Sequence, residues 1–174
     1  MKALALVIGL AVAGLPGASL ADDGVTPDAV IAKVREAAAH LAKEGKAGLA
    51  AFEEAGSPFV WGDTYVFALD CAADVIAAHP VAASRGVKIS SLKDANGKAY
   101  GGELCAAADK PGGSWAEYVW PKPAKGENGE VTYSKEAFRK VSYVVSVDGQ
   151  PYQVGAGIYN DPMSLGELDA LVPK

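Results

Sequence analysis

The first regular pattern in the chain is an apolar stripe with helical spacing, which begins after Thr26. Thr26, Pro27 and Asp28 supply an N-cap side chain, a proline at the first helical position and an acidic residue in the first turn, and together they indicate a helix start. The apolar residues that follow recur at intervals of three and four, as on one face of a helix: Ile31, Val34, Ala38, Leu41, Leu49 and Phe52. The pattern predicts one long helix over residues 27–55, bent at the glycines that interrupt it.

From Phe59 onward the pattern changes to runs of aromatic and β-branched residues, separated by clusters of Gly, Pro, Asp and Asn. Such runs and clusters are typical of strands and turns. The runs predict five strands, at residues 65–69, 75–79, 114–120, 140–147 and 153–159. The first of these is apolar at every position, which predicts a strand that is covered on both faces. Pro80 ends the second, because proline cannot donate a sheet hydrogen bond.

The connections between these strands differ in character. Residues 81–113 form a long connection with two turns and a short helix at 103–108, and a connection of this length in a small domain is usually functional. Residues 121–134 form a polar excursion between the third and fourth strands. Asp148-Gly149 is typical of a tight hairpin turn between the last two.

The chain ends with the signals of a short closing helix. Ser164 and Glu167 have the spacing of a capping box, and an apolar stripe of three leucines begins beside them. One helix followed by a run of strands predicts an α+β domain with an antiparallel sheet.

The start of the chain has the composition of a secretory signal peptide. A lysine and a short apolar stretch are followed by small residues ahead of a cleavage point after Ala21. The alternative is an uncleaved anchor, but Pro16 shortens the apolar stretch below the roughly 20 residues that a membrane-spanning helix needs. We therefore expect a signal peptide at 1–21, a single domain at 22–174 without a membrane span, and a periplasmic or secreted product.

Charge and cysteine content narrow the class of protein. Acidic residues outnumber basic ones by 21 to 16, and no basic cluster extends beyond Arg139-Lys140, so neither nucleic-acid nor anionic-membrane binding is supported. An oxidising compartment favours a disulfide between the two cysteines, Cys71 and Cys105. The alternative is a catalytic thiolate, which would need a nearby histidine or a helix N-terminus to lower its pKa.

Motifs of other chemistries fail on inspection. Residues 112–116 approach the nucleophile elbow of hydrolases but lack its second glycine. Residues 94–97 begin like a calcium loop, yet no acid stands at the twelfth position. Residues 155–157 lack the third glycine and the helix of a dinucleotide site, and two histidines with two paired cysteines leave too few ligands for a transition metal. We predict no catalytic residue, no metal site and no cofactor.

Six fragments, read in order, carry a resemblance to a known family. They are FVWGDTYVF at 59–67, AAHP at 77–80, Gly86 with LKD at 92–94 and Gly97, GSWAEYVWPKP at 113–123, KVSYV at 140–144 and VGAGIY at 154–159. In this order they resemble the single Cache domains of the second type. The resemblance implies a PAS-like fold, in which a long N-terminal helix packs on one face of a five-stranded antiparallel sheet and a small-ligand pocket lies on the other face.

The resemblance also implies a class of ligand. Family members bind small organic acids, typically short carboxylates such as pyruvate, lactate or propionate, and most are extracellular parts of chemoreceptors and sensor kinases that act in signal transduction and chemotaxis. Lys140 matches the lysine that meets the carboxylate, and its three donors suit that role; a solvated surface lysine is the alternative. His79 matches the His-Pro pair at the pocket wall, where it donates to a ligand or reports pH, or is a satisfied structural histidine.

Aromatic residues complete the candidate pocket. Trp115 and Tyr118 lie on opposite faces of an ideal strand, so one of them belongs to the core unless the strand twists or bulges. The remaining candidates offer hydroxyl donors or an apolar floor, with a core position as the alternative for each: Tyr143, Tyr159, Tyr65 and Phe67.

These observations lead to one main hypothesis and two alternatives. The main hypothesis is extracytoplasmic binding of a small carboxylate without catalysis, with the result passed to a partner such as a membrane sensor protein. The first alternative is an interaction or dimerisation module whose pocket is vestigial and whose long helix pairs with its own copy, as a homodimer, or with that sensor. The second is a hydrolase or thiol enzyme that uses one of the cysteines.

Overall fold

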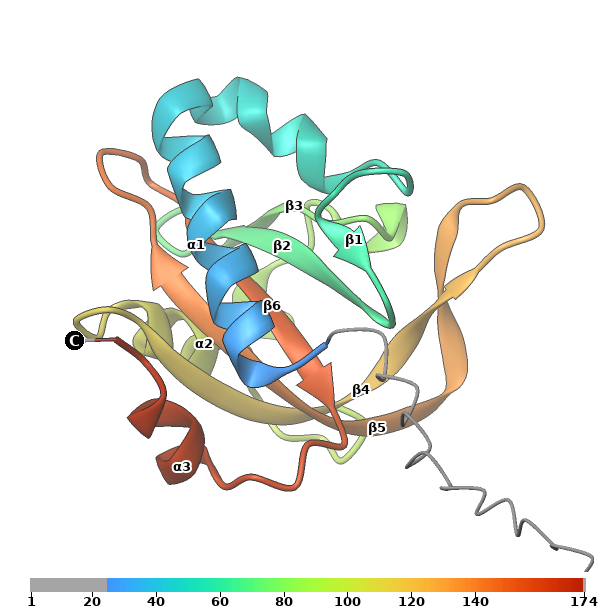
Figure 1. Cartoon of the computed structure of the whole chain (residues 1–174). Coiled ribbons are helices and arrows are strands. Elements are labelled where there is room, and N and C mark those ends of the chain that lie inside the picture. The colour runs from blue at the N-terminus through green and yellow to red at the C-terminus, as the bar shows by residue number, and fades with distance from the viewer. Residues whose placement is uncertain (1–24, 174) are drawn as a thin grey trace, which may run out of the picture.

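Helices cover both faces of an antiparallel sheet in the computed structural model, which describes residues 25–173 (Figure 1). The N-terminal helix α1 (Pro27–Glu44) lies across one face, and α2 (Gly101–Ala108) packs on the other. The closing helix α3 (Leu165–Ala170) has the predicted capping box and packs against the edge strand β4. The predicted signal peptide at 1–21 lies outside the described residues, and no helix within 25–173 is long and apolar enough to cross a membrane.

The sheet has six strands in the order β1-β2-β6-β5-β4, and β3 also pairs with β2. Their bounds are β1 (Val60–Trp61), β2 (Thr64–Asp70), β3 (Val75–Ala78), β4 (Ser114–Lys125), β5 (Val131–Ser146) and β6 (Gln153–Tyr159). All five predicted strands are therefore confirmed, and β2 is buried along its length as expected. The two-residue strand β1 was not predicted, because so short a run has no alternating pattern.

The predicted continuous helix over 27–55 is wrong in its second half. The α-helix ends at Glu44, and the 3₁₀ helix η1 (Gly45–Phe52) continues in a new direction (Figure 1). Gly45 stands at this corner with φ of 58°, in a region that glycine enters without steric cost. The apolar stripe misled the prediction because Leu49 and Phe52, although no longer on an α-helix, still reach the same core as α1.

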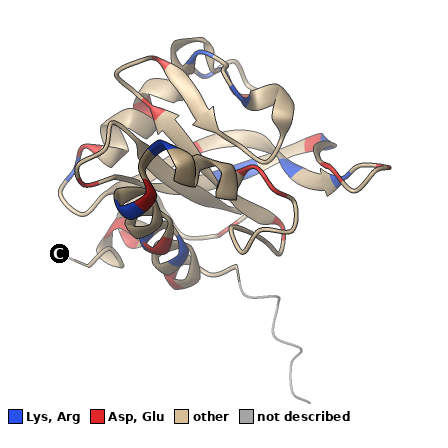
Figure 2. Ribbon diagram, turned by 90° about the horizontal axis from the view of Figure 1, so that it is seen from above, with Lys and Arg blue, Asp and Glu red and all other residues tan. Residues whose placement is uncertain are grey.

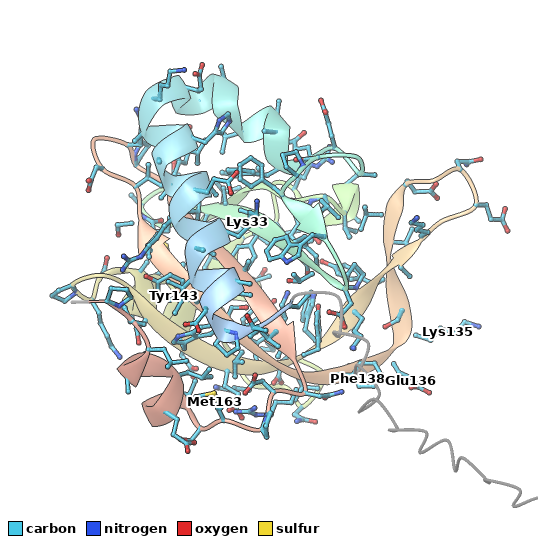
Figure 3. All side chains as sticks on the ribbon, in the orientation of Figure 1. Lys33, Lys135, Glu136, Phe138, Tyr143 and Met163 are labelled. Carbon is cyan, nitrogen blue, oxygen red and sulfur yellow. A yellow bond between two sulfur atoms is a disulfide. The ribbon has the colours of Figure 1, made fainter. Side chains whose placement is uncertain are left out.

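The predicted polar excursion at 121–134 is also corrected. Strand β4 runs to Lys125 and β5 begins at Val131, so the two strands continue as a hairpin ribbon that extends beyond the sheet (Figure 1). On this ribbon Lys135 and Glu136 project into solvent (Figure 3). Residues 121–130 show no alternation of apolar and polar residues, because the two strands of the ribbon are held by hydrogen bonds to each other rather than by an apolar face.

Alternate residues of β2, β4, β5 and β6 form two clusters on opposite sides of the sheet, and β3 adds Ala78 to the first and Ile76 to the second. On the α1 side the sheet contributes Val66, Ala68, Trp115, Val141, Tyr143, Val145, Val154, Ala156 and Ile158. On the α2 side it contributes Tyr65, Phe67, Leu69, Ala116, Tyr118 and Val144. Trp115 and Tyr118 therefore face opposite sides, as predicted, because side chains alternate along a strand.

A disulfide joins Cys71 to Cys105 with an S–S distance of 2.05 Å, as predicted. It ties the turn between β2 and β3 to α2, and so holds part of the 81–113 connection against the second face of the sheet. Basic and acidic residues are interspersed over the helices and loops (Figure 2). This mixed distribution agrees with the absence of a basic cluster in the sequence.

Candidate ligand-binding site

A cavity of about 240 Å³ lies between the sheet and the 81–113 connection. The sheet and its ends contribute Tyr65, Phe67, Leu69, Ile76, His79, Tyr118, Trp120 and Tyr133 to the cavity wall. The connection contributes Ala83, Ser84, Val87, Leu92, Tyr100 and Leu104. The long connection thus contributes six residues to the cavity wall, and its functional character stays a prediction.

Two glycines of β6 make room beneath this cavity. Gly155 and Gly157 face the α2 side and carry no side chain there. A Cβ atom on Gly157 would lie 2.5 Å from Lys140 Cε and 2.5 Å from Ser142 Oγ. Glycine at this position therefore lets the Lys140 side chain cross β6 toward β2.

Lys140 carries a buried amine among aromatic rings. Its side chain extends from β5, is 1% exposed, and places Nζ 3.1 Å from the hydroxyl oxygen of Tyr65, to which it donates. The same Nζ lies 4.2 Å from the centre of the Tyr65 ring and 5.0 Å from that of Tyr159. Burial lowers the pKa of Lys140 to about 7, against a smaller raising effect from Asp63. None of the ion pairs among residues 25–173 includes it.

His79 stands beside Tyr65 at the end of β3, with its ring edge-on at 4.6 Å. The backbone N–H of Val81 donates to His79 Nδ1 at 3.0 Å, so the neutral imidazole carries its proton on Nε2, 3.3 Å from the Tyr133 hydroxyl. Burial, with the charges of Lys140 and Arg85, lowers the pKa of His79 to about 3. The imidazole is then uncharged near neutral pH and does not change its charge there, and its two hydrogen bonds fit the alternative of a satisfied structural histidine. The role of donor to a ligand stays a prediction.

The polar groups gather at one end of the cavity. The Tyr133 hydroxyl lies 2.7 Å from Ser84 Oγ and close to His79 Nε2, next to the Tyr65 hydroxyl that receives the Lys140 bond. Burial raises the pKa of Tyr65 and that of Tyr133, so both hydroxyls stay protonated and can donate. The aliphatic part of the cavity wall is formed by Leu69, Ile76, Val87, Leu92 and Leu104.

Of the predicted contact residues, four line the cavity: Tyr65, Phe67, His79 and Tyr118. Lys140 does not line the cavity itself but lies behind Tyr65, which does, and donates to the Tyr65 hydroxyl oxygen. Tyr159 does not line the cavity; its ring centre lies 5.0 Å from Lys140 Nζ, and its hydroxyl donates to the Pro121 carbonyl.

Two predicted contact residues are not part of this cavity. Trp115 and Tyr143 are cross-strand partners and pack together in the cluster on the α1 side; Figure 3 labels Tyr143 beside α1. Trp115 is an odd number of positions from Tyr118 on β4, and Tyr143 is an odd number of positions from Lys140 on β5. Strand alternation therefore places Trp115 and Tyr143 on the opposite face.

Sequence reasoning missed three aromatic residues of the wall. Tyr133 belongs to the segment predicted as a polar excursion, although Val131 to Tyr133 is a run of strand-forming residues that could have indicated it. Trp120 ends a predicted strand without having been assigned to the pocket. Tyr100 stacks on Tyr118 at 4.2 Å between ring centres, a contact between distant segments that leaves no local sequence signal.

Comparison with known proteins gives the family. The family model of the single Cache domain 2 matches residues 23–162. The chain belongs to this family. No curated protein matches this Cache domain.

Three solved structures share the fold of this Cache domain. A methyl-accepting chemotaxis protein from Vibrio parahaemolyticus RIMD 2210633 is 20% identical, with a TM-score of 0.56, and the match covers 77% of this chain and 88% of that protein's chain. A periplasmic sensor domain of a chemotaxis protein is 23% identical with a TM-score of 0.51, covering 78% and 90%. A Cache chemosensory domain described for its carboxylic acid recognition is 23% identical with a TM-score of 0.52, covering 75% and 86%. At these identities the likeness establishes the PAS-like α+β fold.

Proposed function

We propose that this Cache domain binds a small carboxylate outside the cytoplasm and performs no catalysis. The observation that carries the proposal is the position of Lys140, a buried amine without an ion-pair partner among residues 25–173, whose hydrogen bond to Tyr65 connects it to the cavity. A buried cation in this setting costs stability unless a negative charge accompanies it. A ligand carboxylate in the cavity is the group that supplies this charge.

The carboxylate occupies the polar end of the cavity and accepts hydrogen bonds from the Tyr65 and Tyr133 hydroxyls and from His79 Nε2. Lys140 acts through Tyr65: its Nζ donates to the Tyr65 oxygen, which frees the Tyr65 hydrogen for the ligand. A hydrogen bond supported by a charge in this way is stronger than one between neutral groups. Binding raises the pKa of Lys140, because the negative ligand favours the charged amine.

The relatives support this ligand class and the location. One related domain is described for its recognition of carboxylic acids, and another is a periplasmic sensor domain. The disulfide between Cys71 and Cys105 suits an oxidising compartment. We therefore propose a signal peptide at 1–21, a domain at 22–174 that is periplasmic or secreted, and a membrane sensor protein as the partner that responds to the bound state.

Calorimetry and thermal unfolding of the full chain test the proposal with propionate, pyruvate, benzoate, glycine and putrescine. At a hundredfold excess over the dissociation constant, an acid stabilises the fold by about 2.7 kcal/mol. Lys140→Met and Tyr65→Phe remove this shift, whereas Lys135→Met, a control on the exposed part of the same strand, retains it. The proposal fails if no acid gives heat or a thermal shift, or if Lys140→Met binds acids as the unmodified chain does.

A further inference from the structure

The volume of the cavity limits the size of the proposed carboxylate ligand. An apolar cavity of about 150 Å³ holds one benzene molecule, which is about 25 Å³ per non-hydrogen atom. At that density the cavity of about 240 Å³ holds roughly nine or ten non-hydrogen atoms. Benzoate and phenylacetate have this size. Propionate and pyruvate are little more than half as large and would leave much of the cavity without contacts, and unfilled apolar space forfeits dispersion energy.

The wall of the cavity suits a flat ring. Tyr100 and Tyr118 stack in parallel at 4.2 Å, and Trp120 stands at 60° to Tyr100 with 5.4 Å between centres. Tyr133 stands at 90° to Trp120 at 5.6 Å. A cavity surrounded by rings at these angles offers both faces and edges to another ring, the two arrangements that aromatic pairs prefer.

The lining also restricts the ligand to one charge. No Asp, Glu, Lys or Arg stands among the lining residues, all of which lie in the described chain. The side-chain polar groups of Ser84, His79 and Tyr133 lie within hydrogen-bonding distance of one another, whereas the aliphatic part of the wall, formed by Leu69, Ile76, Val87, Leu92 and Leu104, has no polar side-chain atom. A second carboxylate or an ammonium group there would be buried without a partner, which carries a large desolvation cost.

We infer that the ligand is an aryl monocarboxylate of the size of benzoate or phenylacetate, an assignment that rests on the proposed carboxylate function. The carboxylate lies at the Tyr65 and Tyr133 end, and the ring lies between Trp120 and the aliphatic side chains of Val87 and Leu104. Entry is through the side of the cavity where Ala83 is exposed and Trp120 and Tyr133 are half-buried.

A ligand series on the full chain tests this assignment by calorimetry. Benzoate is expected to bind at least tenfold more tightly than propionate, and several-fold more tightly than cyclohexanecarboxylate, which has the same size without a flat ring. Phthalate, with its second carboxylate, is expected not to bind. Equal or tighter binding of propionate or cyclohexanecarboxylate overturns the aryl assignment and leaves the carboxylate function standing. Absence of binding by every acid overturns both.

A cavity-filling variant locates the ring. Val87 is half-buried on the aliphatic wall, and Val87→Phe adds a ring that occupies roughly the space of four non-hydrogen atoms, about 100 Å³. Benzoate affinity is expected to fall at least tenfold while propionate affinity changes less than threefold, which also shows that the variant is folded. Val172→Phe, at a half-buried valine packed on the α1-side cluster, serves as the matched control and keeps both affinities.

Unchanged benzoate affinity in a folded Val87→Phe chain overturns the assignment, because the ring then lies elsewhere. If Val87→Phe does not fold, Ala83→Phe makes the same test at the exposed entrance, where a larger side chain meets little resistance. Ala83→Phe is expected to lower benzoate affinity by the same tenfold, and an unchanged benzoate affinity would likewise overturn the assignment.

Discussion

The two faces of the sheet use the same strands for different purposes. On the α1 side, side chains from α1, η1 and the strands form one continuous apolar cluster. On the α2 side, the alternate residues include Lys140, Ser142 and several tyrosines, and they leave a cavity. Lys140 and Val141 are neighbours in sequence with exposures of 1% and 0%, yet one is a buried cation and the other part of a sealed core. The comparison leads us to expect that the α1 face carries stability and that the proposed binding on the α2 face comes at some cost in stability.

The largest expected effect is on the free energy of unfolding when a buried leucine is shortened, either Leu41 in α1 or Leu104 in α2. Leu41→Ala is expected to lower the free energy of unfolding by about 3 kcal/mol, because a fully buried leucine leaves a void that α1 cannot close. Ligand affinity stays unchanged. Leu104→Ala, which only enlarges an existing cavity, is expected to cost about 2 kcal/mol and to weaken benzoate binding. Urea unfolding and calorimetry measure both. Loss of affinity in Leu41→Ala would contradict the division between the faces.

Smaller effects on the free energy of unfolding are expected at the adjacent positions 140 and 141, and the two have opposite signs. Lys140→Met is expected to raise the free energy of unfolding of the unliganded protein by about 2 kcal/mol at pH 7, because it removes a buried amine and keeps its volume. Val141→Thr is expected to lower it by about 1 kcal/mol, since it buries a hydroxyl in the apolar cluster. Urea unfolding of the two variants without ligand decides the matter, and a destabilised Lys140→Met chain would show that the lysine supports the fold.

The last expected effect on stability is a pH dependence that belongs to Lys140. Burial lowers its pKa in the folded protein to about 7 from 10.5, so between these values the unfolded chain binds more protons. The free energy of unfolding therefore rises with pH above 7, by about 1 kcal/mol per pH unit. Urea unfolding at pH 7 and pH 9 is expected to show this rise in the unmodified chain but not in Lys140→Met.

The affinity for an acid is expected to change in the other direction. The bound carboxylate favours the charged amine, so binding above pH 7 must first protonate Lys140, and the dissociation constant rises by about tenfold per pH unit. Calorimetry with benzoate at the same two pH values measures this. A dissociation constant independent of pH would show that Lys140 does not control the affinity. A rise in stability that persists in Lys140→Met would show that Lys140 does not cause the pH dependence of stability.

Local signals made much of the fold predictable. The helix start at Thr26, the capping box at Ser164 and the bounds of β6 agree with the sequence pattern, since each depends on residues within a few positions of one another. The failures have a common cause. The α-helix was extended past Glu44 and the ribbon of β4 and β5 was missed, because in both places burial or pairing with distant segments, rather than local periodicity, decides the structure.

The candidate site was predictable only where the resemblance supplied residues. Tyr65, Phe67, His79 and Tyr118 line the cavity, and strand alternation alone already separated Trp115 from Tyr118. Composition could not indicate how these residues combine with the connection, which contributes its own side chains to the cavity wall.

The sequence by itself determined the helix caps, the strands, the alternation that divides each strand between two faces, and the pair of cysteines that bridge. Only the tertiary structure decided that Lys140 lies beneath Tyr65 rather than in the cavity, and that the two are joined across 75 residues of chain. The reason is physical. Which side chains meet depends on the register of β5, β6 and β2 and on the room left by Gly157 between them, and this register arises from pairing between strands that no local pattern records.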